Sequence, residues 1–123
     1  NALAPDELIA AVWVPAATGP QQFAKVGTRN AMVIAVCSFA LSLSNGRVGA
    51  CIGSAGPTPL RARAAEAFAA GLTELTDEAA EHFGELLASA ASPIDDVRGT
   101  AAYRRHALSV LARRTLTWAW AER

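Results

Sequence analysis

The sequence predicts an α+β fold, a two-layer sandwich in which an antiparallel sheet of three or four strands is followed by three helices. Two observations predict this class. Apolar runs broken by turn residues fill the first half of the chain, whereas alanine-rich segments with helix-capping residues follow Pro57. Because the strands all precede the helices, segregated layers are favoured over an alternating α/β sheet.

The first strand candidate is Glu7–Val14, whose β-branched and aromatic residues end at Pro15. A weaker candidate, Gln22–Val26, follows a loop and leads into the basic turn Gly27–Asn30. These two segments supply the start of the predicted sheet.

The segment Val33–Gly53 predicts a hairpin, because two apolar runs flank Asn45-Gly46, a dipeptide that suits a two-residue type I′ turn. The predicted partners are Ser44 with Arg47, Leu43 with Val48, Leu41 with Ala50 and Phe39 with Ile52. This register puts the six apolar side chains on one face. The opposite face carries small or polar residues: Ser38, Ala40, Ser42, Arg47, Gly49 and Cys51.

The same register separates the two cysteines. Cys37 shares a face with Phe39 and Leu41, while Cys51 points to the other side, so a disulfide between them would break the ladder. Two free thiols suit a reducing compartment. Neither cysteine is at a helix start or near a histidine in sequence, so neither is expected to act as a nucleophile.

Three helices are expected in the second half. Thr58 as cap and Pro59 as first helical residue predict a helix over 59–70 that stops at Gly71. Thr76 begins a second helix, which runs to about Ala91. Gly99 or Thr100 begins a third. Its predicted apolar face holds Tyr103, Ala107, Val110, Leu111 and Trp118.

Two charged features accompany the third helix. Asp95-Asp96-Val97-Arg98 can indicate acid–base chemistry, but helix capping and an ion pair to Arg104 or Arg105 explain it more simply. Arg114 falls within the predicted apolar face, where it either extends to the edge or pairs with one of the aspartates.

Composition excludes several function classes. Eleven basic and eleven acidic residues give zero formal net charge, which argues against a nucleic-acid partner. No apolar run is long enough to span a membrane and no signal peptide is evident, so we expect a cytoplasmic protein. His82 and His106 lack partners at metal-ligand spacing, and catalytic motifs are absent. We therefore expect neither a metal site nor catalytic residues.

The chain starts at Asn1-Ala2, and its one methionine is Met32. We interpret residues 1–2 as a remnant of an expression tag and residues 3–123 as a single domain taken from a longer protein. Lys25, Arg29 and Arg47 are the basic residues that an anionic cofactor would contact, although a solvated edge also explains them.

Three segments together resemble a known family: Lys25–Val36, Gly53–Ala62 and Pro93–His106. They are similar to the C-terminal domain of the FAD-binding, or medium, subunit of molybdenum hydroxylases. This family includes carbon monoxide dehydrogenase and the flavin region of xanthine dehydrogenase. The resemblance covers nearly the whole chain from Glu7 to about Trp118.

The resemblance implies a place in electron transfer. Electrons pass from a molybdenum cofactor on a large subunit, across [2Fe-2S] clusters on a small subunit, to FAD on the medium subunit and then to an acceptor. This domain would help to enclose the flavin beside the N-terminal FAD-binding domains and be inactive and empty of FAD alone. The alternative is a subunit-assembly domain without flavin contact.

Site residues are implied at matching positions. Ile34 matches the start of the strand that approaches the cofactor, and Lys25 and Arg29 match the basic residues before it. Val33 departs from the family, whose members usually have aspartate there. The third segment, including Asp95, Asp96, Arg98, Tyr103 and Arg104, is expected to be structural.

Overall fold

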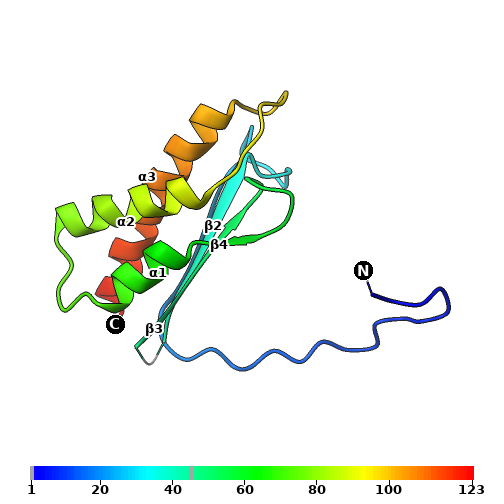
Figure 1. Ribbon diagram of the computed structural model, residues 1–123, viewed down its shortest axis with the longest axis horizontal. Coiled ribbons are helices and arrows are strands. Elements are labelled where there is room, and N and C mark those ends of the chain that lie inside the picture. The colour runs from blue at the N-terminus through cyan, green and yellow to red at the C-terminus, as the bar shows by residue number, and fades with distance from the viewer. Residues whose placement is uncertain (1, 45) are drawn as a thin grey trace.

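The computed structural model describes residues 2–44 and 46–123, and its strands precede its helices as predicted. The elements are β1 (Gln21–Val26), β2 (Cys37–Ser44), β3 (Arg47–Gly53), β4 (Leu60–Arg61), α1 (Arg63–Ala70), α2 (Asp77–Ala90) and α3 (Ala101–Ala121). The strands form an antiparallel sheet in the order β1-β2-β3-β4. In Figure 1 the helices lie on one side of this sheet, which confirms the α+β class.

The β2–β3 hairpin has the predicted register. Ser44 pairs with Arg47, Leu41 with Ala50 and Phe39 with Ile52. Gly46 has a φ of +74°, as the second position of a type I′ turn requires. Asn45, the other residue of the predicted turn, and Asn1 of the predicted tag remnant lie outside the described residues.

The core lies between the inner face of the sheet and the helices. Phe39 and Ile52 of the hairpin are fully buried, and the Phe39 ring meets the edge of Phe83 on α2 with the centroids 6.2 Å apart. Cys37 is also buried on this face, whereas Cys51 lies on the outer face and is half-buried, so the two thiols are free as predicted.

The prediction of a strand at Glu7–Val14 was wrong. The segment is extended but pairs with no described strand, and Figure 1 shows it running away from the domain. The first strand is β1, which matches the weaker candidate. A segment rich in strand-forming residues becomes a strand only when its backbone pairs with a neighbouring strand. In the described residues this segment has no such neighbour.

The predicted start of the first helix was also wrong. Leu60–Arg61 pairs with Cys51 and Ile52 as β4, and α1 begins only after Ala62, which provides no side-chain cap. The helix does stop at Gly71 as predicted, but with a φ of −86°, which any residue can adopt. Sheet pairing therefore overrides the helix-start signal of Thr58-Pro59.

The two longer helices begin where the caps predicted. The hydroxyl oxygens of Thr76 and Thr100 accept hydrogen bonds from the amides of Ala79 and Tyr103, both at 3.1 Å. The predicted face of α3 was wrong in part. Ala107 is buried as predicted, but Tyr103 and Trp118 are about half exposed. The buried residues of α3 are Arg104, Ala107, Leu108, Ala112, Thr115, Leu116 and Ala119.

Small side chains explain this rotation of α3. Ala112 and Ala119 are fully buried, which lets the helix pack closely on the rest of the core. Arg114, predicted within the apolar face, is exposed. The arginine that the fold does bury is Arg104.

Candidate functional site

Three of the four predicted site residues lie in the β1–β2 connection or at the end of β1 beside it. Lys25 is exposed near the end of β1, and its Nζ donates to the Val33 carbonyl at 3.3 Å. Arg29 is exposed in the following turn, where its carbonyl accepts from the Ala31 amide at 2.9 Å. Ile34 is 70% exposed just before β2. The fold thus places the exposed side chains of these three residues at one end of the sheet, in or next to the β1–β2 connection.

Arg47 lies elsewhere. It begins β3 opposite Ser44, at the end of the hairpin away from the β1–β2 connection. Eight residues of β2 separate the two places, which corresponds to roughly 25 Å of extended strand. The sheet therefore does not bring Arg47 together with the other three candidates.

A buried arginine braces the end of the sheet next to the β1–β2 connection. The Arg104 side chain is 3% exposed, and its Nη1 donates to the carbonyls of Val36 at 2.6 Å and Ser54 at 2.8 Å. Its Nη2 donates to the Asp96 carboxylate at 2.5 Å. One side chain of α3 thus joins the start of β2, the turn after β3 and the loop before α3.

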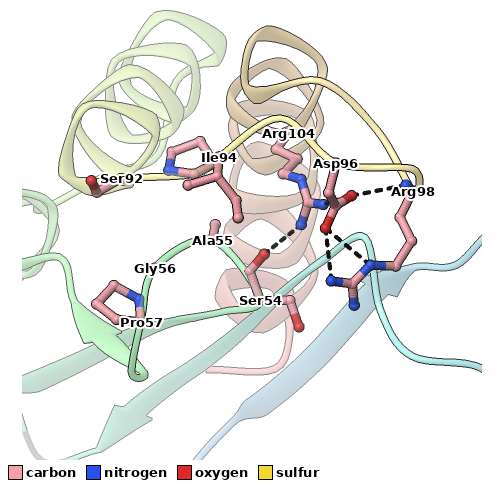
Figure 2. Close-up of a pocket in the computed structure, with 10 residues that line it drawn as sticks. Ser54, Ala55, Gly56, Pro57, Ser92, Ile94, Asp96, Arg98 and Arg104 are labelled. Carbon is pink, nitrogen blue, oxygen red and sulfur yellow. Dashed lines mark hydrogen bonds and ion pairs between the residues drawn. The ribbon is translucent and has the colours of Figure 1, made fainter.

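Asp96 is the acceptor at the centre of this cluster, which Figure 2 shows. Its carboxylate accepts from the Arg98 amide at 2.8 Å and from Nη2 of Arg98 at 2.7 Å. The Arg98 amide, followed by the side chains of Arg98 and Arg104, lowers the pKa of Asp96 to about 2. A carboxyl that stays ionised throughout the neutral range cannot serve as a general acid there.

The other groups of the cluster are also structural. The Asp95 carboxylate accepts from the Ala101 amide in the first turn of α3. Burial raises the pKa of the Cys37 thiol, and the charge of Arg104 offsets this only in part, so the thiol is kept neutral and unreactive. The predicted ion pair to Arg104 and the predicted capping role are both confirmed.

A cavity of about 470 Å³ lies beside this cluster, between the turn after β3 and the loop before α3 (Figure 2). Its walls are mostly apolar or backbone, from Ala55, Pro57, Pro93 and Ile94. Ser54, at its edge, has a left-handed φ of 59°. Sequence reasoning missed this cavity, because it forms between segments almost forty residues apart.

The outer face of the sheet is the second open surface. Phe23 of β1 is exposed beside Ala40, and the neighbouring positions Ser42, Gly49 and Cys51 are small. Together they line a shallow hollow of about 410 Å³. The predicted small and polar character of this face is confirmed, and the exposed Phe23 adds an apolar contact that the sequence analysis did not single out.

We also searched the described residues for a metal site and for a membrane-spanning helix. In residues 2–44 and 46–123, no group of three or more His, Cys, Asp and Glu side chains is placed to hold a metal ion. None of the described helices has the length and apolar character needed to cross a membrane. The exposed Lys25, Arg29 and Ile34 side chains offer two cations and an apolar surface to a partner or cofactor.

Comparison with protein families identifies the domain family to which most of the chain is similar. Residues 22–119 match the model for the CO dehydrogenase flavoprotein C-terminal domain. Comparison with curated protein sequences gives no match. The match begins within β1 and ends near the last turn of α3, so it covers the sheet and all three helices but leaves out the extended segment before β1.

Solved structures of similar fold come from larger proteins. Carbon monoxide dehydrogenase from Hydrogenophaga pseudoflava, in a form lacking the Mo-pyranopterin moiety of its cofactor, is 27% identical with a TM-score of 0.71, over 84% of this chain and 37% of that one. Reconstituted CO dehydrogenase from Oligotropha carboxidovorans is 24% identical with a TM-score of 0.72, over 85% and 37%. Quinoline 2-oxidoreductase from Pseudomonas putida 86 is 21% identical with a TM-score of 0.69, over 80% and 36%. The chain thus spans little more than a third of these structures.

Proposed function

The chain belongs to the CO dehydrogenase flavoprotein C-terminal domain family, and from this premise we propose that it is the C-terminal domain of the FAD-binding subunit of a molybdenum-containing hydroxylase. In that subunit it helps to enclose the flavin, which relays electrons from [2Fe-2S] clusters to an acceptor. The domain supplies no catalytic group of its own. The observation that carries the proposal is the family match over the sheet and helices.

The β1–β2 connection is the part of the domain that we assign to the flavin. Among the described residues, neither Lys25 nor Arg29 has a carboxylate partner, so both cations are available to an anionic cofactor. The exposed Ile34 side chain offers an apolar contact beside them. These residues fit one side of a flavin nucleotide, and the rest of its binding site would come from the domains that precede this one.

FAD, when bound, supplies the electron-accepting ring. This chain's contribution is to hold the loop in place, because Arg104 anchors Val36 at the end of the loop to α3. An anchored loop loses less conformational entropy when a cofactor binds. Arg47, the fourth candidate, is at the opposite end of β2 and would meet a different part of the complex.

The outer face of the sheet is the surface that we assign to the neighbouring FAD-binding domains. Its small side chains permit close approach, and the exposed Phe23 is an apolar anchor of the kind that interfaces use. We propose two further partners, an iron–sulfur small subunit and a molybdenum large subunit, and the family membership supports them. We propose the cytoplasm as the compartment, which the two free thiols support.

The test is FAD retention by the full-length subunit. The double variant Lys25→Gln/Arg29→Gln removes two charge-assisted contacts, and we expect FAD affinity to fall about tenfold to a hundredfold. FAD per polypeptide is measured by absorbance after gel filtration. Arg105→Gln, an exposed arginine of α3, is the matched control and should retain FAD at the wild-type level.

Two further variants sharpen this test. Ile34→Ser examines the apolar contact, and Arg47→Gln decides whether the opposite end of the hairpin contributes. Retention of FAD at the wild-type level in Arg47→Gln would remove Arg47 from the site. If the Lys25/Arg29 variant keeps its FAD but no longer co-purifies with the other subunits, the assembly role replaces the flavin role.

A further inference from the structure

The cavity beside Arg104 has no part in the proposed function, because none of the four predicted site residues lines it. Its volume of about 470 Å³ lies within the range of about 300–1,000 Å³ that is usual for small-molecule sites. The Ser92 amide donates to the Ala55 carbonyl at 2.9 Å, which ties the loop before α3 to the turn after β3. Pro57 and Pro93, one in each of these segments, restrict the backbone further. The cavity is therefore already formed, and a ligand would bind with little reorganisation of the protein.

The charged groups that line the cavity favour an anion. Among the described lining residues they are Arg98, Arg104 and Asp96. The Asp96 carboxyl has a pKa of about 2 and is ionised at neutral pH, so it balances one of the two guanidinium groups. One positive charge is left over, which suits a ligand that carries a single negative charge.

Each of the two arginines also has hydrogen-bonding capacity left over. The Arg104 side chain is 3% exposed, and its Nε is the one buried side-chain polar atom of the described residues without a hydrogen-bond partner. Buried donors are nearly always paired, with the protein, with water or with a ligand. Arg98 directs its Nε and Nη2 to Asp96, which leaves its Nη1 outside this contact (Figure 2). A ligand with acceptor oxygens would complement this end of the cavity.

The other walls of the cavity are apolar. They come from Ala55 and Pro57 on one side and from Pro93 and Ile94 on the other. In Figure 2 the Ile94 side chain extends from the loop before α3 toward Ala55. Ile94 is 71% exposed, so most of its apolar surface is uncovered in the described chain. An inorganic anion would leave these walls in water, whereas an anion with a compact apolar body would cover them.

We propose that this cavity binds a small organic carboxylate, with the carboxylate at Arg98 and Arg104 and the apolar body against Pro57, Pro93 and Ile94. Arginine suits this ligand because its planar guanidinium pairs with a carboxylate through parallel hydrogen bonds. A phosphate dianion would exceed the single positive charge that is left over in the cavity. The site is separate from the residues assigned to the flavin, so its test is independent of the proposed function.

Benzoate is the probe, because it combines a carboxylate with a compact ring. Titrated into the isotope-labelled 123-residue chain, it should shift the amide NMR signals of Ala55, Gly56 and Ile94 saturably, with a dissociation constant of about 1 mM or lower. Benzamide has the same shape without the charge, and acetate has the charge without the ring, so each should bind at least about tenfold more weakly. Benzoate shifts that do not saturate, or an equal affinity for benzamide, would overturn the proposal. Shifts confined to Lys25–Val33 would also overturn it, because they would place the anion on the β1–β2 connection.

Two substitutions test the assigned contacts. Arg98→Gln removes one guanidinium group, and Ile94→Asp replaces an apolar wall with a negative charge, so each should weaken benzoate binding at least about tenfold. Both side chains are substantially exposed, and an unchanged melting temperature without ligand verifies that each variant is folded. Arg105→Gln, an exposed arginine outside the lining, is the matched control and should bind benzoate as the wild type does. Wild-type affinity in either Arg98→Gln or Ile94→Asp would refute the assignment.

The same titration on the full-length subunit decides whether the cavity is open to a free ligand there. We expect benzoate to bind with the same affinity and to raise the melting temperature, with or without FAD. If the 123-residue chain binds benzoate and the full-length subunit does not, a neighbouring domain fills the cavity, contrary to the proposal. Benzoate binding by a subunit whose FAD retention is independent of Lys25 and Arg29 would support the cavity and contradict the proposed function. A subunit that retains FAD as proposed but does not bind benzoate would do the reverse.

Discussion

The buried guanidinium of Arg104 donates to the carboxylate of Asp96 at 2.5 Å, and this pair ties α3 to the loop before it. The same guanidinium also donates to two backbone carbonyls, those of Val36 and Ser54. The start of β2, the turn after β3 and the region around α3, which are distant in sequence, therefore depend on one side chain. Its removal would leave three acceptors without their donor at the end of the sheet that carries the candidate site.

Arg104→Leu should lower the free energy of unfolding by about 3–5 kcal/mol, because breaking a buried ion pair leaves its partners unsatisfied. The measurement is urea denaturation followed by tryptophan fluorescence. Arg105→Leu, at the adjacent exposed position, should change stability by no more than about 0.5 kcal/mol. Similar denaturation midpoints for the two variants would show that Arg104 does not brace the fold.

Asp96 predicts a specific acid dependence. The pKa of Asp96 is about 2 in the folded chain, against an ordinary value of 3.8. Between about pH 4 and pH 2, therefore, the carboxyl is protonated in the unfolded chain but still ionised in the folded chain. The stability due to Asp96 is therefore present above about pH 4 and is lost as the pH falls toward 2. The slope of the unfolding free energy against pH measures the number of protons taken up on unfolding. In Asp96→Asn this number should be smaller by about one in this interval. Asp6→Asn, in the exposed N-terminal segment, should keep the wild-type slope.

Gly84 is a point of close approach between α2 and α3. A Cβ there would lie 2.7 Å from the carbonyl oxygen of Ser109. Gly84→Ala should destabilise the domain by about 1–3 kcal/mol despite the better helix propensity of alanine. The matched change Gly71→Ala, where the nearest atom is 3.6 Å away, should stay within about 0.5 kcal/mol of wild type. Thermal unfolding of both variants makes the comparison, and equal melting temperatures would contradict it.

Ser54 adopts a left-handed backbone conformation that costs a non-glycine residue about 1–2 kcal/mol. Ser54→Gly should relieve this strain and stabilise the domain by up to about 1 kcal/mol, after the greater freedom of glycine in the unfolded state is subtracted. Ser54→Val should destabilise it, because a β-branched side chain is least compatible with that conformation. Chemical denaturation of the pair tests the assignment, and the opposite order would refute it.

The 123-residue chain alone should bind no stoichiometric FAD. It spans 37% of the Hydrogenophaga carbon monoxide dehydrogenase chain that it resembles. Three of its four candidate contacts lie in or next to one exposed loop, which can cover only one side of a nucleotide. Isothermal calorimetry with FAD should give no saturable heat, while the FAD-depleted full-length subunit should bind one equivalent. A micromolar or tighter affinity for the 123-residue chain would show that this domain holds the flavin by itself.

Much of the fold follows from local sequence signals. Asn45-Gly46 and the alternation around it predicted the pairing of Phe39 with Ile52, and the Thr76 and Thr100 caps predicted the starts of α2 and α3. These signals succeed because they act over a few residues, where backbone conformation and side-chain chemistry determine the outcome directly. The candidate site is less predictable. The sequence singled out the basic loop, but the cavity beside Arg104 forms only when remote segments meet.

The sequence alone determined the hairpin register, the separation of the two cysteines and the order of strands before helices. Only the tertiary structure decided that Leu60–Arg61 joins the sheet, that Arg104 rather than Arg114 is buried, and that residues 7–14 stay unpaired. The physical reason is the same in each case. A strand needs the edge of another strand, a buried charge needs hydrogen-bond acceptors, and a helix face needs a complementary surface. A segment distant in sequence provides each of these, and no local pattern specifies where that segment will lie.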